Sequence, residues 1–207
     1  MMRILLVDDH PIVRQGIRHI LTDRMAAVTI GEAADAPGGL QHIRTAEWDV
    51  VVLDITMPGQ SGLDLLKQVR QERPTLPVLV LSMHPATQFA ARVLRAGAQA
   101  YVVKDTAPRD LVDAIERVMH GQRFVSREAI DGLGKAGGQT AHDALSDREY
   151  QVLRMLGSGR RVSEIGNVLG LSVKTISTYR ARVLRKLEMT TNAELMRYAI
   201  ENGLLDS

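Results

Sequence analysis

The first 120 residues alternate short apolar runs with longer segments in which apolar residues recur every three or four positions. The short runs predict β-strands, and the longer period predicts amphipathic helices. Strand and helix patterns alternate five times, an order typical of a parallel sheet covered by helices on both faces. The predicted strands are Arg3–Val7, Val28–Ala33, Val50–Asp54, Val78–Ser82 and Ala100–Val103. The predicted helices are Ile12–Thr22, Pro37–Thr45, Leu63–Glu72, Ala86–Ala96 and Arg109–His120.

Periodicity weakens between Gly121 and Ala144, and residues 132–139 hold four glycines in eight positions. Glycine at this density is unfavourable inside a helix or a strand, so the segment is predicted to be a linker. Four helical patterns follow it. Two of them begin at capping boxes, Ser146 with Glu149 and Thr191 with Glu194. The predicted architecture is a doubly wound, five-stranded parallel α/β domain over residues 1–121, a linker over 122–144, and an all-α domain of four helices over 145–207.

The composition excludes several classes of protein. With 45% hydrophobic and 24% charged residues, the chain has the composition of an ordinary globular protein. No apolar run approaches the roughly 18 residues of a membrane span, so we expect no membrane partner and a cytoplasmic location. The chain has no cysteine, which excludes disulfides, thiol catalysis and cysteine-based zinc sites. Its chemistry therefore rests on oxygen and nitrogen groups.

Acidic, hydroxyl and lysine side chains lie at the carboxyl ends of the predicted strands. The first strand is followed by Asp8 and Asp9, the third ends in Asp54, the fourth ends in Ser82, and the fifth is followed by Lys104. Singly, an acid after a strand is a common turn residue. Together they lie at the carboxyl ends of the strands, where open α/β sheets bind ligands. Converging carboxylates repel unless a cation joins them, and hard oxygen ligands suit Mg²⁺, so the pattern predicts a magnesium-dependent phosphoryl site.

The motifs 5-LLVDDHP-11 and 53-LDITMPG-59, together with Ser82, Tyr101 and Lys104, resemble the receiver domain of two-component response regulators. This is the CheY-like family, which has a flavodoxin-like fold, and the resemblance covers residues 2–120. It implies that Asp54 accepts a phosphoryl group from a sensor histidine kinase. It also implies that the protein is not an enzyme beyond self-catalysed phosphotransfer and dephosphorylation.

The same resemblance implies a role for each residue of the site. The Mg²⁺ ligands would be Asp8, Asp9, Asp54 and the carbonyl of Thr56, with Asp8 as an outer partner of the metal. Ser82 and Lys104 would bind the phosphoryl oxygens, and Tyr101 would move when Ser82 is drawn inward. For Tyr101 a half-buried aromatic at a strand edge is an equal alternative.

Two histidines, His10 and His84, invite a metal interpretation. Neither has a second histidine or a cysteine at ligand spacing, so we assign no metal to them. Thr56 and His84 stand at positions similar to those that, in receivers, adjust how long the phosphoryl group persists.

In the C-terminal segment, the helix pattern Val173–Leu187 has an apolar stripe on one side and a basic face on the other. The predicted stripe is Ile176, Tyr179, Val183 and Leu187. A short helix over 163–169 and a turn at 170–172 precede it, the layout of a helix-turn-helix motif. Residues 145–207 carry ten basic and seven acidic residues. The predicted DNA face comprises Lys174, Ser177, Thr178, Ala181, Arg182 and Arg185, with Arg180 and Lys186 as further candidates for phosphate contacts. The alternative is a basic face that is merely solvated.

Three motifs, 145-LSDREYQVLRMLGSG-159, 163-SEIGNVLGLSVKTIS-177 and 184-LRKLEM-189, resemble the LuxR-type helix-turn-helix of the NarL/FixJ subfamily. Gly166 stands where that pattern usually has alanine, and Tyr179 where it often has histidine. The stretch 177-STYRARVLRKL-187 is similar to regulators of the GacA and BvgA type. The resemblance implies sequence-specific binding to double-stranded DNA and a homodimer when phosphorylated. For dimer contacts the last helix offers Leu195, Tyr198 and Ala199, although ordinary core is an equal alternative for Leu195 and Ala199.

Two other classes of function compete with a phosphorylation-dependent transcription regulator. The first is a phosphatase of the haloacid dehalogenase kind, because Asp54 begins an Asp-x-Thr sequence. That class expects a second acid two residues after the nucleophile, where this chain has Thr56. The second is an interaction protein that keeps the receiver architecture without being phosphorylated. The presence of both Asp54 and Lys104 disfavours it.

Overall fold

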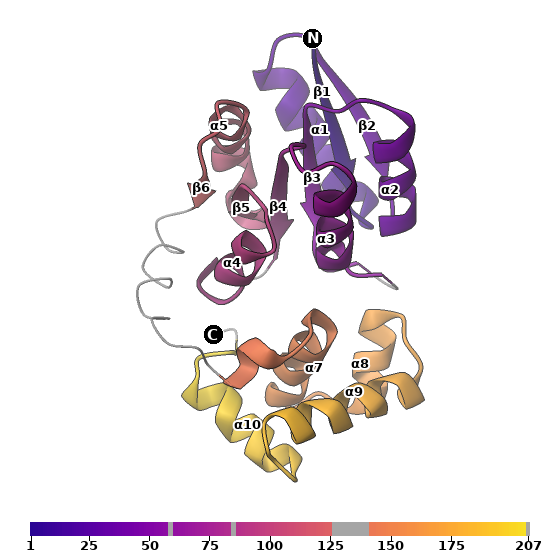
Figure 1. Ribbon diagram of the computed structural model, residues 1–207, viewed down its shortest axis with the longest axis vertical. Coiled ribbons are helices and arrows are strands. Elements are labelled where there is room, and N and C mark those ends of the chain that lie inside the picture. Colours follow the sequence, from indigo (N-terminus) through magenta and orange to yellow (C-terminus); the bar gives the residue numbers. More distant parts are fainter. Residues whose placement is uncertain (58–59, 84–85, 126–140, 206–207) are drawn as a thin grey trace. The chain divides into compact units, whose positions relative to one another are not determined.

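The computed structural model describes residues 1–57, 60–83, 86–125 and 141–205, and the chain divides into two compact units, Met1–Lys135 and Ala136–Ser207 (Figure 1). None of the helices in these ranges has the length and apolarity needed to cross a bilayer.

The first unit is built on a six-stranded parallel sheet with strand order β2-β1-β3-β4-β5-β6. Its strands are β1 (Met2–Val7), β2 (Val28–Ala33), β3 (Val50–Asp54), β4 (Val78–Ser82), β5 (Ala100–Val103) and β6 (Phe124–Val125). Its helices are α1 (Pro11–Arg24), α2 (Ala36–Thr45), α3 (Gly62–Glu72), α4 (Ala86–Arg95) and α5 (Ala107–Met119), with a 3-10 turn at Lys104–Thr106.

Both faces of the sheet are covered, which explains why the strands read as continuous apolar runs. Ile4 and Leu6 belong to the core that packs against α1 and α5. Val7 points to the other face, where it lies close to Gly39 of α2. Figure 1 shows α2 and α3 together on that side of the sheet. Because side chains alternate along a strand, each strand contributes to both cores.

The five predicted strands and five predicted helices are all present, within one or two residues at most ends. The sixth strand, Phe124–Val125, was not predicted, and it falls within the predicted linker. A strand of two residues has no detectable period, and only its pairing with Ala100 and Tyr101 of β5 defines it. The glycine-rich stretch 132–139 lies outside the described residues.

The second unit contains only helices among its described residues: a 3-10 turn at Ala141–Ala144, then α7 (Asp147–Gly157), α8 (Val162–Leu169), α9 (Val173–Lys186) and α10 (Asn192–Glu201). Both predicted capping boxes are present, at Ser146 and at Thr191. The 3-10 turn lies inside the segment that was predicted to be linker. Helix α7 packs against both α9 and α10 and so forms the centre of the unit.

Candidate functional site

The carboxyl ends of β1 and β3 bring the predicted acids together. β1 lies between β2 and β3, and the connections on its two sides lead to helices on opposite faces, which opens a crevice at this edge of the sheet. Asp8 and Asp54 are both buried there, at 3% and 2% exposure. Two buried carboxylates at one point require compensating charge.

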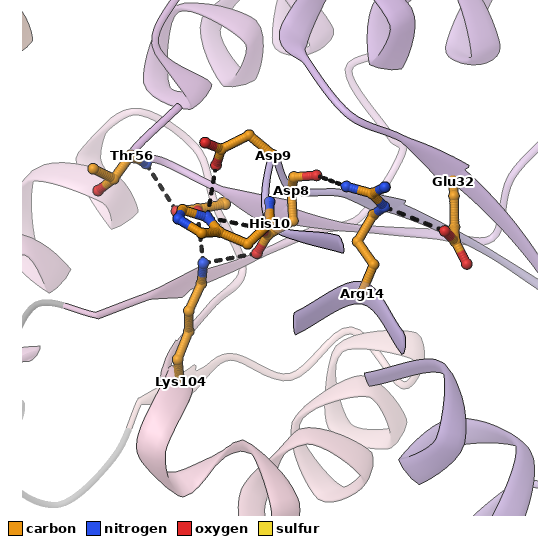
Figure 2. A network of polar contacts seen from close by, with 8 residues as sticks. Asp8, Asp9, His10, Arg14, Glu32, Thr56 and Lys104 are labelled. Atoms are coloured by element: carbon orange, nitrogen blue, oxygen red, sulfur yellow. Dashed lines mark hydrogen bonds and ion pairs between the residues drawn. The ribbon is translucent and has the colours of Figure 1, made fainter. Parts of the chain in front are cut away.

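Lys104 supplies that charge from the end of β5. Its Nζ lies 2.6 Å from Asp54 Oδ2. The same atom lies 2.7 Å from Asp8 Oδ2 (Figure 2). The other oxygen of Asp54, Oδ1, accepts a hydrogen bond of 2.8 Å from the backbone N–H of Thr56. Burial raises the pKa of Asp54 despite Lys104 and Thr56, which act to lower it. Burial opposes the charge on Lys104, but the carboxylates of Asp54 and Asp8 raise its pKa above the ordinary value, so the lysine is a cation.

The residues at this edge fit a divalent cation. Asp8, Asp9, His10 and Asp54 each place one ligand atom within 4.8 Å of the others. Asp9 Oδ1 is buried and accepts no hydrogen bond from any residue that the structure describes. His10 Nδ1 lies 3.0 Å from this oxygen. The three carboxylates suit the hard oxygen coordination that Mg²⁺ prefers.

Arg14 and Glu32 also belong to this network, and the sequence analysis did not find them. Arg14 Nη1 donates to the carbonyl of Asp8 over 2.6 Å, and its Nε donates to Glu32 Oε2 over 3.2 Å (Figure 2). Burial acts to raise the pKa of Glu32, but Arg18 and Arg14 hold it below the ordinary value. The pair ties the end of β1 to α1 and β2. An arginine on a helix and an acid on a strand carry no signal of this contact in the sequence.

Ser82 and Tyr101 are both fully buried, at 0% exposure. Tyr101 pairs with Val80 of β4, and β6 covers the other side of its strand. The alternative of a half-buried aromatic at a strand edge is therefore wrong, because β5 is not an edge strand. A role of Tyr101 in switching stays a prediction. His84 lies outside the described residues.

In the second unit, α8 and α9 form a helix-turn-helix. Gly170 ends α8 in the left-handed conformation, at φ 62°, which glycine adopts without steric cost. Ser172 then caps α9, because its Oγ accepts a hydrogen bond of 3.1 Å from the N–H of Thr175. Close packing explains the glycine at position 166 of α8, although glycine has a low helix propensity. A Cβ at Gly166 would lie 2.7 Å from the carbonyl oxygen of Leu171 in the turn.

Helix α9 buries one face and exposes the other. Ile176 and Val183 are fully buried and Tyr179 is half-buried, as the predicted stripe requires. Leu184 is also buried, at 8% exposure, and lay outside that stripe. The six residues of the predicted DNA face are all exposed: Lys174, Ser177, Thr178, Ala181, Arg182 and Arg185.

Two further basic residues of α9 are engaged inside the unit. Lys186 Nζ lies 2.7 Å from Glu149 Oε2, and Arg180 Nε donates to Asn192 Oδ1 over 2.6 Å. Both had been considered for phosphate contacts. The structure gives them partners on neighbouring elements, so Arg182 and Arg185 are the stronger candidates.

The Glu149–Lys186 pair leads to a prediction about stability and pH. Burial acts to raise the pKa of Glu149, but the hydrogen bonds from Lys186 and Ser146 hold it below the ordinary value of 4.5. A carboxylate with a lowered pKa stabilises the fold above its unfolded-state pKa, and this contribution is lost as pH falls through the folded-state pKa. We expect Glu149→Gln to destabilise the second unit by about 1–3 kcal/mol at pH 7, and by progressively less as pH falls through the lowered folded-state pKa of Glu149.

Chemical denaturation at several pH values, monitored by hydrogen exchange of the α7–α10 amides in the full chain, measures this difference. Glu164→Gln is the matched control, because Glu164 accepts a capping hydrogen bond from the N–H of Arg161 but is exposed. A loss of stability that stays the same from pH 7 down to the lowest pH at which the unit is folded would contradict the assignment.

The predicted dimer contacts on α10 are mostly core. Leu195 and Ala199 are both at 0% exposure, so the ordinary-core alternative is correct for them. The hydroxyl of Tyr198 lies 2.9 Å from His142 Nδ1. The large apolar side chains that α10 exposes are instead Met196, at 38%, and Ile200, at 65%.

Two protein families match the chain, one in each unit. The family described as "Response regulator receiver domain" matches residues 4–116. The family described as "Bacterial regulatory proteins, luxR family" matches residues 143–199. The first match contains the acidic site, and the second contains the helix-turn-helix.

Relatives match over the whole length. Response regulator UvrY of Escherichia coli (strain K12) is 35% identical, covering 100% of this chain and 97% of UvrY. Response regulator GacA of Pseudomonas aeruginosa is 34% identical, covering 100% of this chain and 99% of GacA. Among solved structures, RcsB from Salmonella enterica serovar Typhimurium, bound to promoter rprA in the presence of phosphomimetic BeF3-, is 30% identical with a TM-score of 0.65, covering 96% of this chain and 98% of that one. The chain therefore belongs to the two-component response regulators of the NarL/FixJ type, in which a receiver domain precedes a LuxR-type helix-turn-helix domain.

Proposed function

We propose that a sensor histidine kinase phosphorylates this protein on Asp54 and that the phosphorylated form is a homodimer that binds specific DNA sites in the cytoplasm and regulates transcription. In this proposal the receiver spans residues 1–121, a linker 122–144 and the DNA-binding domain 145–207. One observation carries it: the buried cluster of Asp54, Asp8 and Lys104 stands in a chain whose second domain exposes a basic helix face.

The chemistry follows from the two oxygens of Asp54. An oxygen of the carboxylate attacks the phosphorus, the bond from phosphorus to the donor's nitrogen breaks, and an acyl phosphate forms. Lys104 lies against Oδ2 and would neutralise charge on the incoming group, while the Thr56 N–H orients Oδ1. A Mg²⁺ held by Asp8, Asp9, Asp54 and the Thr56 carbonyl would supply further neutralisation of the transferring phosphoryl group.

This chain supplies the acceptor and the kinase supplies the donor, so the protein is not an enzyme in the usual sense. Self-catalysed transfer from small acyl phosphates and self-catalysed dephosphorylation are the two reactions that the site supports. A phosphatase of the haloacid dehalogenase kind is disfavoured, because Thr56 offers a hydroxyl where that mechanism needs a carboxylic acid.

A phosphoryl group on Asp54 would add strong hydrogen-bond acceptors within reach of Ser82 and Lys104. Movement of Ser82 toward them would change the packing beside Tyr101, which is buried on the neighbouring strand. We propose that this is how phosphorylation alters the receiver surface. Only interactions that are stronger in the active conformation can shift the population toward it.

DNA binding is proposed for the exposed face of α9. The RcsB structure bound to a promoter supports this role, because that protein is similar over 96% of this chain. A single small helical domain rarely binds DNA with sufficient affinity and specificity, so two copies on two half-sites are expected.

Footprinting across a genome, with and without a small acyl-phosphate donor and Mg²⁺, tests the proposal as a whole. We expect protected sites that contain two related half-sites and that become occupied at lower protein concentration when the donor is present. Sites that are occupied equally with and without the donor would support the phosphorylation-independent alternative instead.

Assembly gives a separate prediction. A difference of a few kcal/mol between two states shifts their populations by orders of magnitude, so phosphorylation should strongly raise the dimer fraction. The measurement is sedimentation of the full chain with and without a phosphate mimic at Asp54. An association constant that is the same with and without the mimic would contradict phosphorylation-driven dimerisation.

The exposed face of α10 gives a further prediction. If this face forms the dimer contact, Ile200→Asp should reduce the affinity for the DNA site. Glu201→Gln on the same helix serves as the control.

A further inference from the structure

The proposed phosphotransfer makes no use of the His10 side chain, although its ring lies at the metal site. We propose that His10 Nδ1 is a direct ligand of the metal ion, and that it shifts the preference of this site from Mg²⁺ toward transition-metal dications such as Mn²⁺ and Co²⁺. The inference rests on the proposed metal site and adds a nitrogen donor to its oxygen ligands.

The backbone holds the ring of His10 in place. His10 is the N-cap residue of α1, with φ −92° and ψ 109°, and Pro11 begins the helix behind it. Its N–H donates to Asp8 Oδ1 over 2.8 Å, which ties the residue to the end of β1. The side chain makes no capping hydrogen bond of its own. The imidazole is therefore not used to cap the helix, and its Nδ1 lies instead against the carboxylates of Asp8 and Asp9.

The ring nitrogen faces the carboxylates. His10 Nδ1 lies 3.0 Å from Asp9 Oδ1 and 3.4 Å from Asp8 Oδ1 (Figure 2). His10 is also one of the four residues, with Asp8, Asp9 and Asp54, that each offer one ligand atom within 4.8 Å of the others. Asp9 Oδ1 is the buried oxygen that accepts no hydrogen bond within the described part of the chain. The imidazole and this oxygen thus contact each other at the rim of the site, and a metal ion bound by both would replace the proton between them.

Their separation matches that of two ligands on one ion. Neighbouring ligands of an octahedral cation, each about 2.1 Å from the metal, lie about 3.0 Å apart. The observed 3.0 Å between Nδ1 and Asp9 Oδ1 agrees with that spacing. The His10 side chain is 61% exposed, so an ion can enter from solvent beside it, whereas Asp8 and Asp54 lie at the buried end.

The chemistry of imidazole then determines which metal ions bind more tightly when His10 is a ligand. Mg²⁺ prefers oxygen ligands and holds its waters tightly, so it gains little from a nitrogen donor. Affinity for imidazole-containing sites rises from Mn²⁺ to Co²⁺ along the first transition row. A ring that is already placed loses little freedom on binding. His10 should therefore contribute little to the affinity for Mg²⁺ and substantially to that for Co²⁺.

Metal titration of the unphosphorylated full chain at one fixed pH, by calorimetry with Mg²⁺, Mn²⁺ and Co²⁺, tests the proposal. We expect His10→Ala to lose about tenfold in Co²⁺ affinity while its Mg²⁺ affinity changes less than twofold. His10→Asn keeps a good N-cap residue and a hard oxygen, so it should fold normally and lose the same preference. His19→Ala, an exposed histidine on α1, is the matched control. Bound Mn²⁺ should also show magnetic coupling to an imidazole nitrogen that disappears in both His10 variants.

The outcomes separate this inference from the proposed function. If both His10 variants keep wild-type Co²⁺ affinity, or lose Mg²⁺ and Co²⁺ affinity equally, His10 is not a selective ligand and the inference is wrong. The Asp54→Asn variant tests the metal site of the proposed function separately from the role of His10, because it should weaken the binding of every metal. If Asp54→Asn binds all three ions as the wild type does, then the metal site of the proposed function is itself wrong.

Discussion

The Asp54→Asn variant should take up no phosphoryl group from a small acyl phosphate in the presence of Mg²⁺, whereas the wild type should take up one. The amide of asparagine has nearly the shape of the carboxylate but is not a nucleophile, so the chemical step has no acceptor. Loss of the nucleophile of a covalent step typically costs several orders of magnitude in rate. Intact-mass measurement of the purified protein reads the result directly.

A control separates loss of the acceptor from a general loss of charge. Asp113 is an exposed acid on α5 of the same unit, where it pairs with Arg117, and Asp113→Asn should be labelled like the wild type. The Lys104 cation keeps Asp8 as a partner in the Asp54→Asn variant, so the fold of the site should persist. Labelling of that variant at a serine or threonine would sink the assignment of Asp54, and so would labelling of the wild type without metal.

The positions of the acidic residues were predictable because they depend on topology alone. Asp8 and the basic residue Lys104 follow buried parallel strands, and Asp54 ends one; such strands end at one edge of the sheet whatever the details of packing. These strands can be recognised in the sequence as continuous apolar runs, because both faces of the sheet are covered. The structure adds the distances, such as the 2.6 Å between Lys104 Nζ and Asp54 Oδ2.

Features that depend on pairing across the fold were not predictable. The edge position expected as one alternative for Tyr101 failed because β6, a strand of two residues, extends the sheet beyond β5. The contact from Arg14 to Glu32 joins residues 18 positions apart, and no periodic pattern in the sequence predicts it. The internal partner of Lys186 lies 37 positions away. A helical wheel shows which side of a helix is basic but not which basic residues already have partners.

Arg182 and Arg185, two exposed basic residues of α9 with no such internal partner among the described residues, lead to the second prediction, which concerns DNA binding. Replacing both Arg182 and Arg185 by alanine should weaken binding to all DNA, because the two side chains are exposed on the face of α9 opposite its buried stripe. Each lost phosphate contact releases about 0.9 fewer counterions. For two contacts per protomer, the slope of log affinity against log salt should flatten by about 1.8 for each bound protomer, and the affinity in 0.1 M salt should fall roughly 60-fold for each bound protomer.

Thr178→Ala should behave differently, since a small polar side chain near the start of a recognition helix reads base edges and does not neutralise phosphates. It should change the preferred sequence while the salt slope stays close to that of the wild type. Arg197→Ala is the charge control, because Arg197 is 74% exposed on α10 and lies near Glu201. Binding curves for specific and nonspecific DNA over a range of salt concentrations distinguish the three variants. If Arg197→Ala flattened the slope as much per charge as the α9 substitutions do, the effect would belong to the overall charge of the domain, and α9 would lose its assignment as the DNA-reading helix.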